Sequence, residues 1–146
     1  MAWLFGEYKH NLDQKNRLAI PAKLREELGE SFVITLPNNE DGDRCIYAYS
    51  VEDWIEREKI LNSGQQPSPE LTRRQRFMYD NTDRVDVDKQ GRITIPAKFI
   101  GHANLEDEVL LKGVGRRMEM WNPNEREEMV KTAEEKNAIP TFEAPF

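Results

Sequence analysis

The sequence predicts an α+β fold in which one structural unit is used twice within the chain. Residues 11–23, NLDQKNRLAIPAK, return at residues 87–98 as VDKQGRITIPAK. A constant shift along the chain places Asp13 on Asp88, and in each copy an Arg follows the Asp by four positions. A short alternating run then leads to Ile-Pro-Ala-Lys in both copies. These shared features indicate a repeated unit of hairpin and helix.

Each copy is expected to form a strand, a tight turn and a second strand, which together make a two-stranded ribbon. The turns fall at residues 14–16 and 89–91. Asn16 and Gly91 occupy the same position in the two turns. These two residue types tolerate best the positive φ that a tight hairpin turn requires.

The strand after each turn has an alternating pattern. Leu18 and Ile20 share one face of the first strand, and Arg17 lies on the other face. Arg92 and Ile93 begin the same pattern in the second copy. Both Arg side chains are therefore expected on the outer face of their hairpins, beside the turns.

The rest of each unit follows from helix-start signals and apolar runs. Pro21 and Pro96 end the strands and suit the beginning of a helix. The expected helices lie at residues 22–28, 51–61, 70–79, 97–105 and 123–135, and the further strands at 31–36, 45–49, 108–112 and 117–121. The chain then divides into a first repeat at 1–61, a linker loop and basic helix at 62–82, a second repeat at 83–135 and an irregular tail at 136–146.

Composition restricts the class of protein. The 146 residues are 38% hydrophobic and 33% charged, which is typical of a soluble globular chain. The formal net charge of -6 argues against indiscriminate coating of nucleic acid, although basic residues outnumber acidic ones in both motif segments. Cys45 is the only cysteine, so no intramolecular disulfide forms and a reducing cytoplasm is expected. No apolar run approaches the roughly 20 residues of a membrane span.

The motif segments, GEYKHNLDQKNRLAIPAKLREEL and DKQGRITIPAKF, resemble the MraZ family of bacterial transcriptional regulators. The duplicated Asp-x-x-x-Arg motif and the flanking Ile-Pro-Ala carry this resemblance. It implies tandem AbrB-like swapped-hairpin β-barrel halves with short flanking helices, related by a pseudo-two-fold within one chain. Two departures from the family pattern are Asn16, where Gly is more usual, and the Ile-Gly-His run at residues 100–102.

The resemblance also implies a function. The chain would form a ring-shaped homo-oligomer and bind short direct repeats in double-stranded promoter DNA. The promoter would be that of its own division and cell-wall gene cluster, usually with repression as the result, which places the protein in the cytoplasm on the nucleoid.

The resemblance implies that Arg17 and Arg92 contact DNA. An Arg at the tip of a ribbon in the major groove can grip guanine O6 and N7 through two bonds, at about 1–3 kcal/mol of discrimination. The expected DNA-contacting residues are basic and lie on or beside the hairpins: Arg17, Arg92, Lys15, Lys89, Lys23 and Lys98. For the last two, a solvated position on a helix is an equal alternative. Residues expected to support the motif, by fixing the guanidinium or bracing the turn, are Asp13, Asp88, Asn16 and Gly91.

Nothing in the sequence favours an enzyme. His10 and His102 lie at positions that do not match between the repeats, and Cys45 has no sequence partner. A zinc spacing, a glycine-rich phosphate loop and a nucleophile motif are all missing. The pair Asp86 and Asp88 could suggest a metal, but the first copy has Asn at the matching position. We therefore expect no cofactor, no metal and no small-molecule substrate.

Other interpretations use the same residues differently. One Asp–Arg pair alone could be a surface ion pair worth under about 1 kcal/mol. A protein-binding, antitoxin-like module on the same fold is the main functional alternative, and a sequence-blind architectural DNA binder is a third. The basic cluster on the linker helix could form salt bridges, a subunit contact or a DNA contact: Arg73, Arg74 and Arg76. Four aromatic residues are expected in the core or in subunit contacts: Trp54, Phe77, Tyr79 and Trp121.

Overall fold

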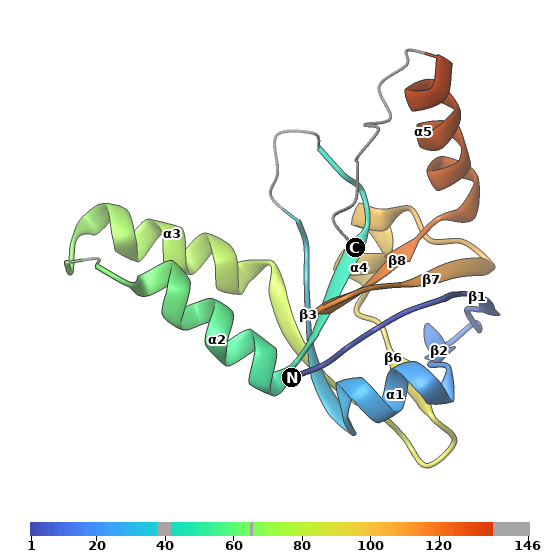
Figure 1. Ribbon diagram of the computed structural model, residues 1–146, viewed down its shortest axis with the longest axis horizontal. Helices are drawn as coiled ribbons and strands as arrows, with labels where there is room; N and C mark the ends of the chain where they lie inside the picture. Colours follow the sequence, from blue (N-terminus) through green and yellow to red (C-terminus); the bar gives the residue numbers. More distant parts are fainter. Residues whose placement is uncertain (38–41, 65, 136–146) are drawn as a thin grey trace, which may run out of the picture.

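A computed structural model describes residues 1–37, 42–64 and 66–135, with the side chains described to residue 132. This part of the chain contains eight strands and five helices (Figure 1). In chain order they are β1 (Glu7–Asn11), β2 (Arg17–Ala19), α1 (Ala22–Leu28), β3 (Ser31–Thr35), β4 (Ile46–Ser50), α2 (Val51–Asn62), α3 (Pro69–Asp80), β5 (Thr82–Asp86), β6 (Arg92–Thr94), α4 (Ala97–Ala103), β7 (Glu108–Val114), β8 (Arg117–Trp121) and α5 (Pro123–Glu135). The expected α+β class and its tandem arrangement are confirmed.

The strands form two sheets, and both sheets mix the repeats. The larger sheet has six strands in the order β1-β7-β8-β4-β3-β5, and the smaller sheet pairs β2 with β6. All of these pairs are antiparallel. The first strand of one repeat, β1, lies against β7 of the other, and β5 likewise lies against β3. The two repeats therefore exchange their first strands.

The local ribbon expected for each hairpin is absent from the fold. Between β1 and β2 the only bridge in the described chain is Leu12 with Leu18. Instead β2 pairs with β6, with Arg17 opposite Thr94 and Leu18 opposite Ile93. A three-residue strand gains little from a local ladder, whereas pairing across the repeats buries both apolar side chains. The expected strand, turn and strand are present in each copy, but the prediction that the two strands of a copy pair with each other as a ribbon was wrong.

The core lies between the sheets and the short helices. Its largest cluster joins residues of both repeats, including Leu18 and Ile93, which are 0% and 1% exposed. The helices α1 and α4 each place their apolar residues in this cluster, among them Leu24 and Phe99. Burial of this shared apolar surface is the main stabilising contribution available to the fold.

Sequence signals fix most of the helix ends. Ser50 accepts the backbone N–H of Asp53 at 3.1 Å and begins α2. Asn122 accepts two backbone N–H groups at the start of α5. The helix α4 ends two residues earlier than expected, because Asn104 takes a left-handed conformation at φ 49°. Cys45 is buried but lies just before β4 instead of within it.

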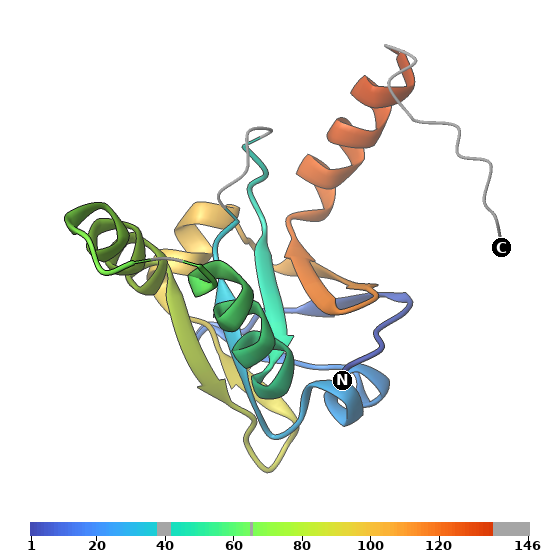
Figure 2. The same ribbon diagram turned by 60° about the vertical axis from the view of Figure 1, so that its left-hand side comes forward.

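The remaining helices project from the sheets. The helices α2 and α3 extend together on one side, and α5 stands away from the body on another (Figures 1 and 2). Among the described residues, no helix is both long and apolar enough to cross a membrane.

Replacing Leu18 with Ala should lower the free energy of unfolding of the whole chain by about 2–5 kcal/mol, because Leu18 is fully buried at the cross-repeat pair. Urea unfolding followed by circular dichroism measures this loss. The two repeats should unfold in one transition, since each completes the sheets of the other. Thr94→Ala, an exposed change on β6, is the control and should stay within about 0.5 kcal/mol. Two separate transitions, only one of them shifted, would contradict the shared core.

Candidate nucleic-acid interface

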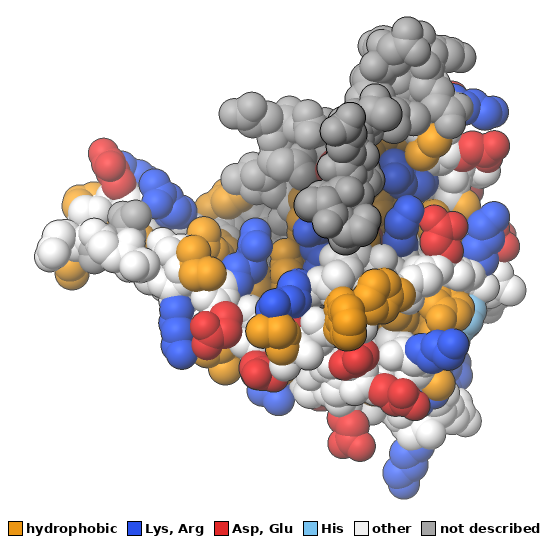
Figure 3. All heavy atoms as spheres, viewed as in Figure 1, with side chains coloured by type: hydrophobic (Ala, Val, Ile, Leu, Met, Phe, Trp, Pro, Cys, Tyr) orange, Lys and Arg blue, Asp and Glu red, His pale blue; other side chains and the backbone are white. Residues whose placement is uncertain are grey.

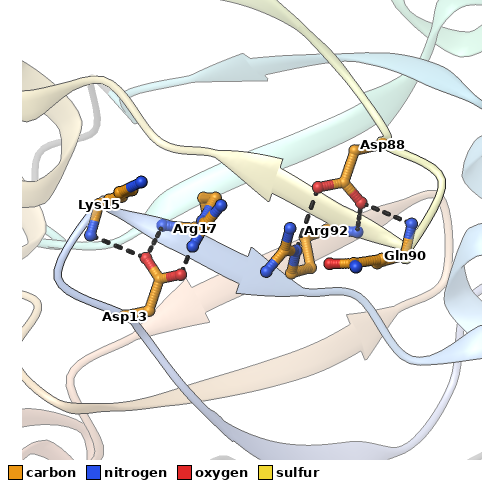
Figure 4. A network of polar contacts seen from close by, with 6 residues as sticks. All are labelled: Asp13, Lys15, Arg17, Asp88, Gln90 and Arg92. Atoms are coloured by element: carbon orange, nitrogen blue, oxygen red, sulfur yellow. Dashed lines mark hydrogen bonds and ion pairs between the residues drawn. The ribbon is translucent and has the colours of Figure 1, made fainter.

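The first motif is a closed network around the Asp13 carboxylate (Figure 4). Its Oδ1 accepts the backbone N–H groups of Lys15 and Arg17, at 2.9 and 2.8 Å. Its Oδ2 accepts Nε of Arg17 at 2.7 Å. Asn16 closes the turn at φ 62°, a left-handed conformation that Asn tolerates. One carboxylate therefore braces the turn and orients the guanidinium at the same time.

The second motif repeats this geometry with small differences. Oδ1 of Asp88 accepts the backbone N–H groups of Gln90 and Arg92, at 2.8 and 2.9 Å. Its Oδ2 accepts Nε of Arg92 at 3.1 Å. Gly91 occupies the left-handed position at φ 79°. The pairing of each Asp with its Arg, expected from the spacing of four, is present in both copies.

These contacts keep the carboxylates charged. The hydrogen bond from the backbone N–H of Arg17 is the largest cause of the lowered pKa of Asp13, and the hydrogen bond from the Arg17 guanidinium lowers it further. The backbone N–H of Arg92 lowers the pKa of Asp88 in the same way. Each carboxylate is thus an ionised acceptor at neutral pH, which is the state that holds the turn.

The guanidinium groups keep part of their hydrogen-bonding capacity. Each Arg donates to its Asp through Nε, which is one of the five N–H donors of a guanidinium. The two side chains are partly exposed, at 32% and 28%. A held guanidinium with available Nη donors suits bidentate recognition of a base edge or phosphate.

Strand register places both motifs on one surface. In the β2–β6 pair, Arg17 lies opposite Thr94 and Ala19 lies opposite Arg92. The side chains of these four residues share one face, because directly opposed residues point the same way. Figure 4 shows the two arginines between the two aspartates on the paired strands. We call this face, with Arg17 and Arg92, the arginine ribbon.

The lysines expected to support DNA binding occupy different environments. Lys15 and Lys89 are exposed at the two turns, and Lys23 is exposed on α1. Lys98 donates from Nζ to the backbone carbonyl of Asp80 at 2.6 Å, so it ties α4 to the end of α3. The structure therefore separates Lys98, which has an internal partner, from Lys23, its counterpart in the repeat.

Arg25 lies beside the second motif, a contact that sequence reasoning missed. It donates from Nε to the carbonyl of Ile20 at 2.9 Å. A Cβ placed on Gly91 would lie 2.8 Å from Nη1 of Arg25, too close for any larger residue without movement. The matching positions are Ile100 in place of Arg25 and Asn16 in place of Gly91. These two differences between the copies were visible in the sequence, but only the fold shows that Arg25 packs on the turn of the other repeat.

The remaining sequence candidates lie elsewhere. The arginine cluster of α3 is exposed and forms no ion pair within the described residues, so a salt-bridged helix face is not present: Arg73, Arg74 and Arg76. Trp54 and Trp121 are buried, whereas Phe77 and Tyr79 are half exposed. Burial raises the pKa of the Cys45 thiol well above its usual value. Within the described ranges, no group of three or more His, Cys, Asp or Glu side chains could hold a metal.

Acid should release the motif network at a pH below the usual titration range of aspartate. Because the pKa of Asp13 and of Asp88 is lowered by folding, their stabilising contribution is full above the unfolded pKa and is lost as pH falls through the folded pKa. Carboxyl ¹³C NMR should give lower midpoints in the folded chain than in urea. In Arg17→Ala the midpoint of Asp13 should stay below its unfolded value, because the backbone N–H remains. Equal midpoints in the two states would contradict the network.

Comparison with known proteins agrees with the repeated motif. The chain matches a protein family described as "MraZ protein, putative antitoxin-like" over residues 3–74 and again over 78–144. It is similar to the "Transcriptional regulator MraZ" of Clostridium tetani, with 37% identity over 84% of each chain. It is also similar to the proteins of that name from Thermoanaerobacter sp., at 40% identity over 86% of this chain and 85% of the relative, and from Caldanaerobacter subterraneus, at 38% over 90% and 89%.

These relatives carry the names of transcription regulators and not of enzymes, in agreement with the expectation from the sequence. The family match covers both repeats and most of the chain, and the relatives match along nearly their full length. Together with the exchanged strands and the two Asp-x-x-x-Arg networks, this shows that the chain belongs to the MraZ family.

Proposed function

We propose that the chain is a sequence-specific, DNA-binding transcription regulator that reads double-stranded promoter DNA with the arginine ribbon. The observation that carries this proposal is the placement of two Asp-held arginines on one face of one strand pair. The names of the relatives support the same class of function. The target would be short direct repeats in the promoter of its own division and cell-wall gene cluster, which the protein would repress.

The arginine ribbon would act in the major groove. A two-stranded ribbon fits that groove, and an Arg that contacts guanine O6 and N7 contributes about 1–3 kcal/mol of base discrimination. Asp13 and Asp88 restrict the arginines before DNA arrives, so less side-chain entropy is lost on binding. Both arginines lie on the same face and can therefore engage one duplex together.

Phosphate contacts would position the ribbon. Lys15 and Lys89 are exposed at the turns and Lys23 on α1, where each can neutralise a phosphate. We assign Lys98 a weaker role because its ammonium group already donates a hydrogen bond to the backbone carbonyl of Asp80. The acidic remainder of the chain, which gives the net charge of -6, disfavours nonspecific binding.

Self-association would multiply these contacts. One chain offers two base-reading arginines, which is a small number for a specific promoter complex. In a ring-shaped homo-oligomer, each direct repeat bound by one chain raises the effective concentration of the next contact. Such a protein would work in the cytoplasm, on the nucleoid.

A protein-binding function is the second candidate, because the description of the matching family includes the words "putative antitoxin-like". Affinity purification of the tagged chain from its own host tests it. A stoichiometric protein partner that competes with promoter DNA would favour this function over the DNA-reading one.

Replacing either reading arginine with Ala should weaken binding to the upstream duplex about 5- to 150-fold, the equivalent of 1–3 kcal/mol. Fluorescence anisotropy with a labelled duplex measures the affinity, and a scrambled duplex gives the nonspecific level. Arg44→Ala is the matched control: it removes the same charge from an exposed side chain whose contacts are with His102 and Glu125.

The account would be contradicted if Arg17→Ala and Arg92→Ala bound the native duplex as tightly as Arg44→Ala does. Circular dichroism of each variant keeps the result interpretable, since loss of folding would affect both duplexes and the spectrum together.

A further inference from the structure

A groove between α2, α3 and the end of β3 is not used by the arginine ribbon. Its cavity volume is about 430 Å³, in the range of peptide and ligand sites. Trp54 and Tyr47 contribute aromatic rings, Met78 and Leu36 contribute aliphatic atoms, and the partly exposed Leu61 also lines the groove. Burial and a hydrogen bond with Glu58 raise the pKa of Tyr79 to about 12, so a neutral hydroxyl links α3 to α2 at physiological pH.

The two helices that line this groove carry many of the exposed apolar side chains. Of the ten large hydrophobic residues that are exposed in the described part of the chain, five lie on α2 and α3: Ile55, Ile60, Leu61, Phe77 and Tyr79. Figure 3 shows hydrophobic side chains next to basic ones over these two helices. Leu61 and Phe77 line the groove itself, and exposed apolar side chains at a groove are typical of an interaction site.

Two basic side chains give the groove a charge preference. Arg57 and Arg74 both line it. Arg57 also lies over the ring of Tyr49, with 5.2 Å between its guanidinium carbon and the ring centroid. Neither Arg forms an ion pair with a carboxylate in the described residues. The groove is therefore suited to an apolar segment that carries negative charge.

The carboxy-terminal segment of the chain has this composition. Residues 136–146 read KNAIPTFEAPF. Ile139, Phe142 and Phe146 are large and apolar, and Glu143 is the only charged residue after Lys136. Aromatic-lined grooves also favour proline-containing peptides, and this segment has two prolines.

The position of α5 favours a neighbouring copy as the source of the segment. The helix leaves the end of β8 and leads away from α2 and α3 in both views (Figures 1 and 2). Its 13 residues carry the chain about 20 Å outward before residue 136 is reached. The segment therefore begins at the outer end of α5, away from the groove of its own chain.

We propose that the groove between α2 and α3 binds residues 136–146 of a second copy of this chain. The inference rests on the self-association that is part of the proposed function, and it names the contact. The groove and the segment are different surfaces of the chain. Each chain would therefore bind the segment of one neighbour in its groove and place its own segment in the groove of another. A head-to-tail contact of this kind generates a closed ring or an open filament.

Disulfide cross-linking between full-length chains tests the contact. One chain carries Leu61→Cys at the groove and the other carries Ala144→Cys in the segment. After mixing and mild oxidation, a cross-linked dimer should form at least about tenfold faster than in a control mixture. In the control, Ala97→Cys, at an exposed position on α4, replaces Leu61→Cys. The native Cys45 is buried and is left in place.

Charge reversal makes the test specific for the groove. Arg57→Glu with Arg74→Glu in the Leu61→Cys chain should reduce cross-linking about tenfold, and Glu143→Arg in the donor chain should restore it. Three results would each overturn the inference. The first is equal cross-linking at the control site, and the second is no response to charge reversal. The third, measured with a chain that carries both Leu61→Cys and Ala144→Cys, is cross-linking only within one chain. If no cross-link forms but Arg17→Ala and Arg92→Ala still weaken DNA binding, this contact alone is refuted. If the cross-link forms but these two changes leave DNA binding unchanged, the DNA-reading proposal alone is refuted.

Discussion

The antiparallel pairing of β2 with β6 is the constraint on which the rest of the molecule depends. It places Leu18 opposite Ile93 at the centre of the core, with almost no exposed surface on either. The same pairing turns Arg17 and Arg92 to the opposite face. Because the two strands come from different repeats, neither repeat can present its arginine in this way alone. We therefore expect folding of the shared core and assembly of the arginine ribbon to be one event.

The two carboxylates then convert a strand pair into an ordered surface. Asp13 and Asp88 each satisfy two turn N–H groups and hold one guanidinium, and each stays ionised because folding lowers its pKa. The copies are nevertheless unequal. Arg25 packs against Gly91 in the second motif, whereas the first motif has Asn16 and no arginine at the matching position. A surface with two similar but distinct halves has a direction, which fits the direct repeats proposed as its DNA target better than a fully symmetric ribbon would.

Much of this arrangement could be predicted from the sequence. The repeat, the turn residues, the first helix and the pairing of each Asp with its Arg follow from local spacing, and local interactions produce them. The partner of each strand could not be predicted, because alternation identifies the apolar face of β2 but not the strand that covers it. Contacts between distant segments were missed for the same reason, among them Arg25 with Gly91 and Lys98 with Asp80. The role of the arginine ribbon in DNA binding remains a prediction.

The most direct test of the central claim is an NMR spectrum of the arginine Nε–H groups, recorded with and without the upstream duplex. If the ribbon reads DNA as one unit, the signals of Arg17 and Arg92 both shift at the same DNA concentration. Both should also stay protected from exchange, since Asp13 and Asp88 continue to accept their Nε–H groups. A shift of only one signal, or of neither, would contradict the account.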